Sequence, residues 1–66
     1  MSILKVLEIL ADSDKSWEDA TKKAIKKASE TVREIRSANV TNQSAVVKDG
    51  EVTSFRVNLK VTFEVS

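Results

Sequence analysis

The stretch that decides the fold is residues 55–65, FRVNLKVTFEV, in which apolar and polar side chains alternate without interruption. Its apolar members are Phe55, Val57, Leu59, Val61, Phe63 and Val65. Strict alternation is typical of a β-strand that buries one face and leaves the other face polar. The sequence therefore predicts a long last strand with one dry face.

This strand is longer than a compact monomer can accommodate. If pairing begins near Val52, the strand has about 14 residues and a length of ~46 Å, at ~3.3 Å per residue. A compact chain of 66 residues has a radius of gyration of about 11 Å and is about 28 Å across. We therefore expect the strand to bend around the rest of the chain, to extend onto a neighbouring copy, or both.

The composition also favours self-association. A domain of this size buries only about 60% of its unfolded surface and is marginally stable alone. The chain has no Cys, His or Pro, which excludes disulfides and the usual zinc sites. Oligomerisation is the remaining way to stabilise so small a domain.

The residue inventory also argues against catalysis. With no His, Cys or Tyr, the familiar nucleophile–base pairs cannot be built. A single glycine excludes a glycine-rich phosphate loop. We therefore expect that the protein is not an enzyme.

Charge and hydropathy do not indicate a polyanionic or membrane partner. The net charge is +1 and the isoelectric point is near 8.0, too close to balance to imply nucleic acid or anionic lipid. There is no signal peptide and no apolar stretch approaching ~18 residues. We expect a soluble, cytoplasmic protein.

The first half of the chain predicts a strand and then a helix. Residues 3–10, ILKVLEIL, favour a strand covered on most of both sides, with a buried helical turn as the alternative. Residues 11–15 are polar and turn-forming, and Ser16 to Asp19 form an S-x-x-D capping box in which Asp19 reaches back. The helix is predicted to begin at about Trp17 and to end within residues 36–38.

The two faces of this helix differ in composition. The predicted inward stripe consists of Trp17, Ala20, Ala24, Ala28, Thr31 or Val32, and Ile35. The outer face carries Lys22, Lys23, Lys26 and Lys27. Glu18 and Asp19 lie one turn before the first two lysines and Glu30 one turn after Lys26, which favours a solvated face with local ion pairs over a basic binding surface.

The second half predicts a hairpin. Residues 39–47 form a polar-rich strand, and Asp49-Gly50 marks the turn into the last strand. The order strand, helix, strand, strand predicts an α+β fold in which a three-stranded antiparallel sheet curls around one helix. With no repeats or linkers, residues 1–66 form a single domain.

The order and spacing of several short motifs resemble the dodecin family over almost the whole chain. These motifs are Ser16-Trp17-Glu18-Asp19-Ala20, Ala28-Ser29-x-Thr31-Val32-x-x-Ile35, Asp49-Gly50, and Phe55-Arg56-Val57-x-Leu59-x-Val61-x-Phe63. The resemblance implies a β-α-β-β protomer assembled as a hollow homododecamer. It also implies storage of a flavin, riboflavin or FMN, between aromatic side chains of different subunits.

Two positions depart from the flavin-binding members of the family. Where those proteins stack a tryptophan on the flavin ring, three residues before the valine that matches Val40, this chain has Ser37. Where they place a glutamine at the ring edge, it has Arg56. A hydroxyl offers no π face, whereas a guanidinium pairs with anionic groups. The departures resemble a subgroup without the tryptophan, of which some relatives have been described as calcium-binding.

Four residues are therefore candidates to line a ligand site between subunits: Ser37, Arg56, Asn39 and Gln43. Each has a plainer alternative, which for Arg56 is pairing with Glu64 or another carboxylate across an interface, and for Asn39 and Gln43 is a solvent or interface position. Trp17 is interpreted as a lid on the core or a contact between subunits. Asp12, Asp14 and Asp49 are oxygen donors without EF-hand spacing, and no metal site is assigned.

Two classes of function remain open at this stage. The first is a non-enzymatic binding and storage assembly for flavin or another planar or anionic small ligand. The second is a flavin-free assembly with an ion-binding (calcium) or purely structural role, in which the polar face of the last strand forms ion pairs between subunits or lines an aqueous cavity.

Overall fold

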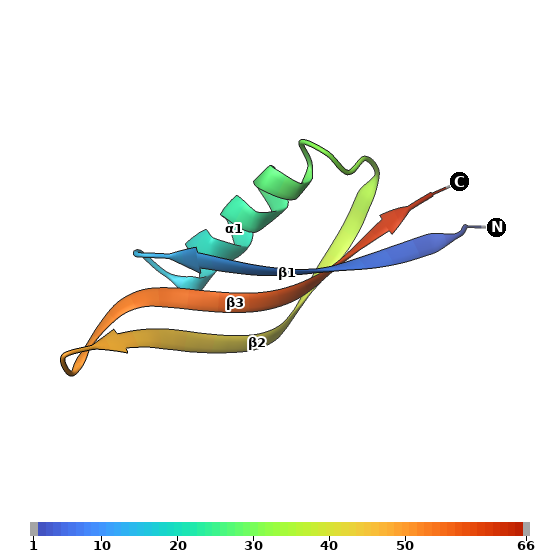
Figure 1. Ribbon diagram of the computed structural model, residues 1–66. Coiled ribbons are helices and arrows are strands. Elements are labelled where there is room, and N and C mark those ends of the chain that lie inside the picture. The colour runs from blue at the N-terminus through green and yellow to red at the C-terminus, as the bar shows by residue number, and fades with distance from the viewer. Residues whose placement is uncertain (1, 66) are drawn as a thin grey trace.

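The last strand lies at the centre of a three-stranded sheet that one helix covers on a single face (Figure 1). The computed structural model describes residues 2–65. Along the chain it forms β1 (Leu4–Ser13), α1 (Trp17–Ala28), β2 (Ile35–Lys48) and β3 (Glu51–Glu64). The sheet order is β1-β3-β2, with both pairs antiparallel. The predicted element order and α+β class are confirmed.

Strand β3 has the two-sided character that its alternation predicts. Val57, Leu59 and Val61 are fully buried and pack against Ala20 and Ala24 of the helix. Because neighbouring side chains of a strand point to opposite faces, the residues between them lie on the uncovered face. We call the two faces of the sheet the helix side and the helix-free side.

The sheet extends well beyond the helix, as the strand length predicts. The molecule measures 50 × 20 × 14 Å and its radius of gyration is 13.5 Å, against about 11 Å for a compact chain of this length. The 12 residues of α1 span ~18 Å, whereas the 14 residues of β3 span ~46 Å. One helix therefore covers less than half of the sheet length (Figure 1).

The helix begins where the capping motif predicts, with one difference. The Asp19 backbone N–H donates to Ser16 Oγ at 2.9 Å, which satisfies one of the free amides of the first turn. The Asp19 carboxylate does not reach back to Ser16; it accepts a 2.6 Å hydrogen bond from the Ser13 hydroxyl. This bond satisfies the side chain of Ser13, which is only 5% exposed, and ties the end of β1 to the helix.

The predicted helix end within residues 36–38 is wrong, because α1 ends at Ala28. The chain makes one further turn, in which the Val32 N–H donates to the Ala28 carbonyl at 2.8 Å. Glu34 then adopts a left-handed conformation with φ of 63°, which no helix continues. Ile35 is the first residue of β2 and pairs with Phe63. Its apolar side chain therefore belongs to a strand and not to the predicted helical stripe.

The strand boundaries also differ from those predicted. β1 continues past Leu10 to Ser13, because Asp12 and Ser13 still pair with β3. β2 begins at Ile35 rather than Asn39 and extends to Lys48.

The predicted hairpin is confirmed. Lys48 pairs with Glu51 across a two-residue turn, in which Asp49 and Gly50 have φ values of 53° and 79°. Two positive φ values define the turn type that Asp-Gly favours.

Candidate functional site

Three of the four predicted site residues lie on the helix-free side of the sheet. In β2, Ser37 pairs with Thr62 and Asn39 pairs with Lys60. Directly paired residues share a face, and Thr62, Lys60 and Arg56 alternate with the buried row of β3. Ser37, Asn39 and Arg56 are therefore exposed on one face.

The fourth residue, Gln43, lies on the opposite face. It pairs with Val57 of the buried row, and it lines a shallow pocket of about 290 Å³ between α1 and β2. The neighbouring walls of that pocket include Trp17, Lys22 and Val40. Gln43 therefore cannot contact the same ligand as Ser37 and Asn39 within one protomer.

Ser37 and Arg56 are far apart within one chain. Ser37 is opposite Thr62, whereas Arg56 is opposite Ser44. The two positions on β3 differ by six residues, which corresponds to ~20 Å along a strand at ~3.3 Å per residue. A single protomer does not bring these two side chains together.

Arg56 is held by a carboxylate of its own chain. Its Nε donates to Asp12 Oδ1 at 2.7 Å and its Nη2 donates to Asp12 Oδ2 at 3.1 Å. This is the bidentate arrangement that a guanidinium favours. The hydrogen bond from Arg56 lowers the pKa of Asp12, and the same bond raises the pKa of Arg56. Within the same chain, Glu64 accepts a hydrogen bond from Arg36 Nε at 3.1 Å. Pairing of Arg56 with Glu64 or another carboxylate across an interface stays a prediction.

All three aromatic side chains of the chain lie on the helix side. Trp17 and Phe55 meet edge to face with ring centroids 5.0 Å apart, and the indole N–H donates to the Ser44 carbonyl at 2.9 Å. Phe63 alternates into the same row as the buried residues of β3 and pairs with Ile35, which packs against the core. Trp17 itself packs against the core cluster, which supports its interpretation as a lid.

The helix-free side therefore does not fit a stacked flavin. Within residues 2–65, no aromatic ring faces this side, so the isoalloxazine has no platform there. Two of the nitrogens with which Arg56 would meet a ligand are already bonded to Asp12.

The aspartates considered as calcium ligands do not gather into a site. Across residues 2–65, no three acidic side chains lie close enough together to hold a metal ion. Asp12 is bonded to Arg56, and Asp49 lies in the hairpin turn.

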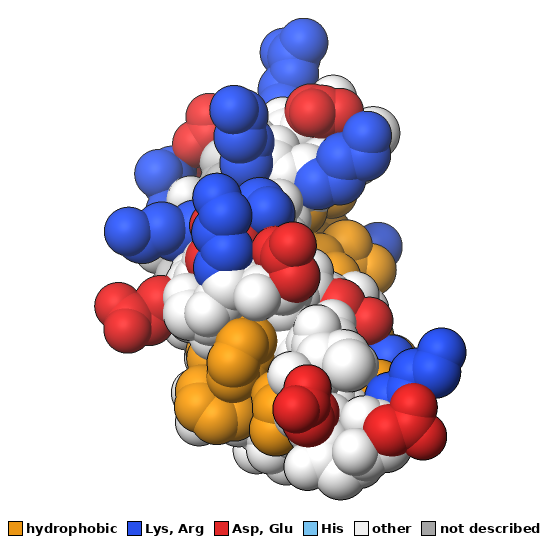
Figure 2. Space-filling model, turned by 90° about the vertical axis from the view of Figure 1, so that its left-hand side faces the viewer, with side chains coloured by type: hydrophobic (Ala, Val, Ile, Leu, Met, Phe, Trp, Pro, Cys, Tyr) orange, Lys and Arg blue, Asp and Glu red, His pale blue; other side chains and the backbone are white. Residues whose placement is uncertain are grey.

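The lysine-rich helix face carries local ion pairs. Lys23 Nζ lies 3.0 Å from the Asp19 carboxylate and Lys27 Nζ lies 3.4 Å from that of Glu30. Glu30 thus pairs with Lys27 rather than with the predicted Lys26. Figure 2 shows acidic and basic side chains intermixed over this upper part of the molecule, which favours a solvated face.

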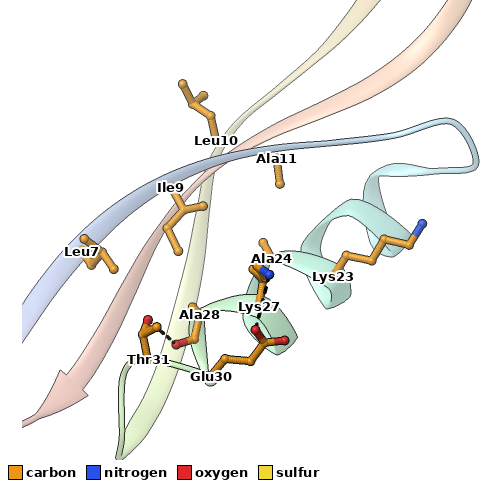
Figure 3. Close-up of a pocket in the computed structure, with 10 residues that line it drawn as sticks. All are labelled: Leu7, Ile9, Leu10, Ala11, Lys23, Ala24, Lys27, Ala28, Glu30 and Thr31. Carbon is orange, nitrogen blue, oxygen red and sulfur yellow. Dashed lines mark hydrogen bonds and ion pairs between the residues drawn. The ribbon is translucent and has the colours of Figure 1, made fainter.

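The sequence reasoning missed an apolar groove between α1 and β1. It has a volume of about 440 Å³, and its floor is formed by Leu7, Ile9, Ala11, Ala24 and Ala28. Figure 3 shows the three β1 side chains pointing toward the helix and Leu10 pointing away from it. The alanine stripe of the helix was the available signal, because small residues leave the neighbouring strand partly uncovered.

Within the described residues, no helix has the length and apolar character that a membrane span requires.

Comparisons with known proteins give a consistent result. The chain is 36% identical to the calcium dodecin of Mycobacterium tuberculosis over 64 residues, which cover 97% of this chain and 90% of the relative. A crystal structure of that organism's calcium dodecin, described as a calcium chelating antigen with a novel calcium-binding site, aligns with a TM-score of 0.85 at 35% identity, over 98% of this chain and 93% of the other.

A second solved structure, the dodecin of Streptomyces coelicolor, aligns with a TM-score of 0.93 at 28% identity. That alignment covers 98% of this chain and 93% of the other. The family model named Dodecin matches residues 3–66. This chain belongs to the dodecin family.

Proposed function

We propose that this protein is a non-enzymatic binding protein whose copies assemble into a homododecamer of the dodecin type and hold a small ligand between them. The ligand contacts the helix-free side, where Ser37, Asn39 and Arg56 are exposed. It is held by hydrogen bonds and charge rather than by aromatic stacking.

The observation that carries this proposal is the separation of Ser37 from Arg56. The two side chains share a face but lie six residues apart in register, or ~20 Å. A small molecule cannot touch both within one protomer. We therefore expect a site between two copies, in which Ser37 of one copy and Arg56 of the other contact the same ligand.

The ligand is not expected to be a stacked flavin. Loss of one aromatic platform costs ~1–3 kcal/mol per ring, by analogy with base stacking, and this loss recurs in each subunit that contributes to the site. Asp12 also compensates the charge of Arg56, so an anionic ring or phosphate gains less from it than from a free guanidinium.

The test is a titration with riboflavin and FMN, followed by flavin fluorescence, on the wild-type protein and on Ser37→Trp. We expect no saturable quenching with wild type at micromolar protein and saturable quenching with Ser37→Trp. Ser37→Ala is the matched control and should behave as wild type. Saturable quenching by wild type would overturn the exclusion of stacking, and a monomeric sedimentation coefficient would overturn the assembly.

Calcium is a second candidate ligand, favoured by the 36% identity to a relative named calcium dodecin. Because no three acidic side chains within residues 2–65 gather in one protomer, a calcium site here needs oxygen donors from more than one copy. Calorimetric titration of chelator-treated protein with Ca²⁺, with Mg²⁺ as control, distinguishes this ligand. Heat with Ca²⁺ that disappears when the assembly is dissociated is the expected result for a site between subunits.

A further inference from the structure

A second pocket lies on the helix side of the sheet, between the first half of α1 and strand β2. It has a volume of about 290 Å³, and it is lined by Trp17, Glu18, Thr21, Lys22, Val40 and Gln43. This volume is at the lower end of the range for ligand pockets, roughly 300–1,000 Å³. An occupant must therefore be a small molecule.

An irregularity in β2 builds the strand wall of this pocket. Val40 pairs with Leu59. Gln43 pairs with Val57, so both residues lie opposite the buried row of β3. Residues three apart in an unbroken strand lie on opposite faces, but the register shift between Val40 and Asn42 puts both side chains on the helix side. Bulges are common next to active sites because they redirect a side chain.

The helix has two acid–lysine pairs at the same spacing, and only one of them is closed. The Asp19 carboxylate lies 3.0 Å from Lys23 Nζ. Glu18 and Lys22 are also four residues apart, but neither forms an ion pair with any of residues 2–65. Both of them line the pocket. The pocket therefore presents a carboxylate and an ammonium group from one turn of the helix.

The remaining polar groups of the pocket complement these two charges. The Thr21 hydroxyl donates its proton to the Trp17 carbonyl at 2.9 Å, so toward a ligand its oxygen acts as an acceptor. Thr21 and Glu18 thus supply acceptors for a cationic group. The Lys22 ammonium is a donor only, and the Gln43 amide has two N–H donors. Lys22 and Gln43 thus supply donors for an anionic group.

Trp17 and Val40 give the pocket an apolar part. The Trp17 indole N–H is already bonded to the Ser44 carbonyl at 2.9 Å, so the indole offers apolar ring surface to an occupant. Val40 is a large apolar residue that remains 37% exposed. Covering these two side chains with an apolar group is favourable, because it removes apolar surface from water.

We propose that this pocket binds the zwitterion of a small apolar α-amino acid. Glu18 and Thr21 hold its ammonium group, Lys22 and Gln43 hold its carboxylate, and its side chain lies against the indole of Trp17. Both charges of an α-amino acid are carried on a single carbon, which matches two side chains one helical turn apart, with Cβ atoms about 5–6 Å from each other. The inference is independent of the ligand proposed for the helix-free side.

The test is a titration of the wild-type protein with L-leucine, followed by tryptophan fluorescence. Trp17 is the only tryptophan and lines the pocket, so its emission reports on an occupant directly. We expect a saturable change with a dissociation constant on the order of 1 mM, because a shallow pocket covers only part of the ligand. Isocaproate lacks the ammonium group of leucine, and isoamylamine lacks its carboxylate. Each should bind roughly tenfold more weakly, since each loses one charged contact.

Two variants test which residue holds which charge. Glu18→Gln should abolish the preference for leucine over isocaproate, and Lys22→Gln should abolish the preference for leucine over isoamylamine. Lys26→Gln is the matched control, because Lys26 is an exposed lysine of the same helix outside the pocket, and it should keep both preferences. Circular dichroism checks the fold of each variant.

Three results would overturn the inference. The first is that leucine at about 50 mM, well above the expected dissociation constant, changes neither the emission of Trp17 nor the amide NMR shifts of Trp17 and Gln43. The second is equal affinity of the wild-type protein for leucine and isocaproate, which would indicate a site for simple anions. The third is that both preferences persist in Glu18→Gln and Lys22→Gln.

Discussion

The two faces of strand β3 differ in burial: one is packed against the helix and the other is exposed. On the helix side, Val57, Leu59 and Val61 are fully buried and depend on one another and on the alanines of α1. On the helix-free side, Arg56 is exposed and held by a single partner, Asp12. One set of residues of this strand thus stabilises the fold, and the other set forms an exposed polar surface.

This difference shows which kind of substitution each face tolerates. Changes on the helix side alter packing that the whole domain shares, so their effects on stability are large. Changes on the helix-free side alter exposed pairs whose contribution to stability is small. The side chains on the helix-free side can therefore be substituted without loss of the fold.

The largest effect is expected from Phe63→Asp. Phe63 continues the apolar row beyond the buried core and is half-buried in the protomer. A charge there must stay in water, so no partner can cover the row, and the assembly should dissociate. Sedimentation velocity should then show a protomer-sized species in place of the assembled particle.

Thr53→Asp is the matched control for this prediction, since it adds the same charge at an exposed position of the same strand. It should leave the sedimentation coefficient unchanged. If Phe63→Asp also leaves it unchanged, the apolar row does not contribute to assembly and the two faces differ less than proposed.

A smaller effect is expected from Leu59→Ala. Leu59 is fully buried in the cluster with Ala20 and Ala24, and its truncation should lower the free energy of unfolding by about 2–5 kcal/mol. Lys60→Ala, on the opposite face, should change it by no more than about 0.5 kcal/mol. Urea unfolding at one fixed protein concentration measures both, and equal losses would contradict the comparison.

The smallest effect is expected from Asp12→Asn, which removes the ion pair with Arg56. The hydrogen bond from Arg56 lowers the pKa of Asp12 in the folded protein, so this group stabilises the fold above its unfolded pKa of about 3.9. That contribution is lost as the pH falls through the lower, folded pKa.

The melting temperature of wild type should therefore fall more steeply below about pH 4 than that of Asp12→Asn. Ser44→Ala, which lies opposite Arg56 on β2 and removes no titrating group, is the control. Asp19, whose pKa is lowered by the Ser13 hydroxyl and by Lys23, still titrates in both variants. Identical acid profiles for wild type and Asp12→Asn would show that the pair makes no net contribution.

Much of the fold follows from local patterns in the sequence. The alternation of residues 55–65 predicts the central strand, Asp49-Gly50 predicts the hairpin, and Ser16 predicts the helix start, because each depends on neighbours in the chain. The helix end was mispredicted because the spacing of Val32 and Ile35 fits a helical stripe as well as a turn followed by a strand. Only the pairing of Ile35 with Phe63, a long-range contact, decides between them.

The candidate site was less predictable for the same reason. Alternation shows that Arg56 is on the polar face, but not that Asp12 lies opposite it, since their pairing joins residues 44 positions apart. The bulges in β2 also shift which residues share a face. Gln43 and Asn39, four residues apart, therefore lie on opposite faces, where an unbroken strand would have put them on one.

The position of the single tryptophan makes docking of the helix directly observable. Trp17 belongs to α1, its indole donates to the backbone of β2, and its ring meets Phe55 of β3. Its emission spectrum and anisotropy therefore report whether these three elements are in contact. This optical signal can therefore follow folding of the chain.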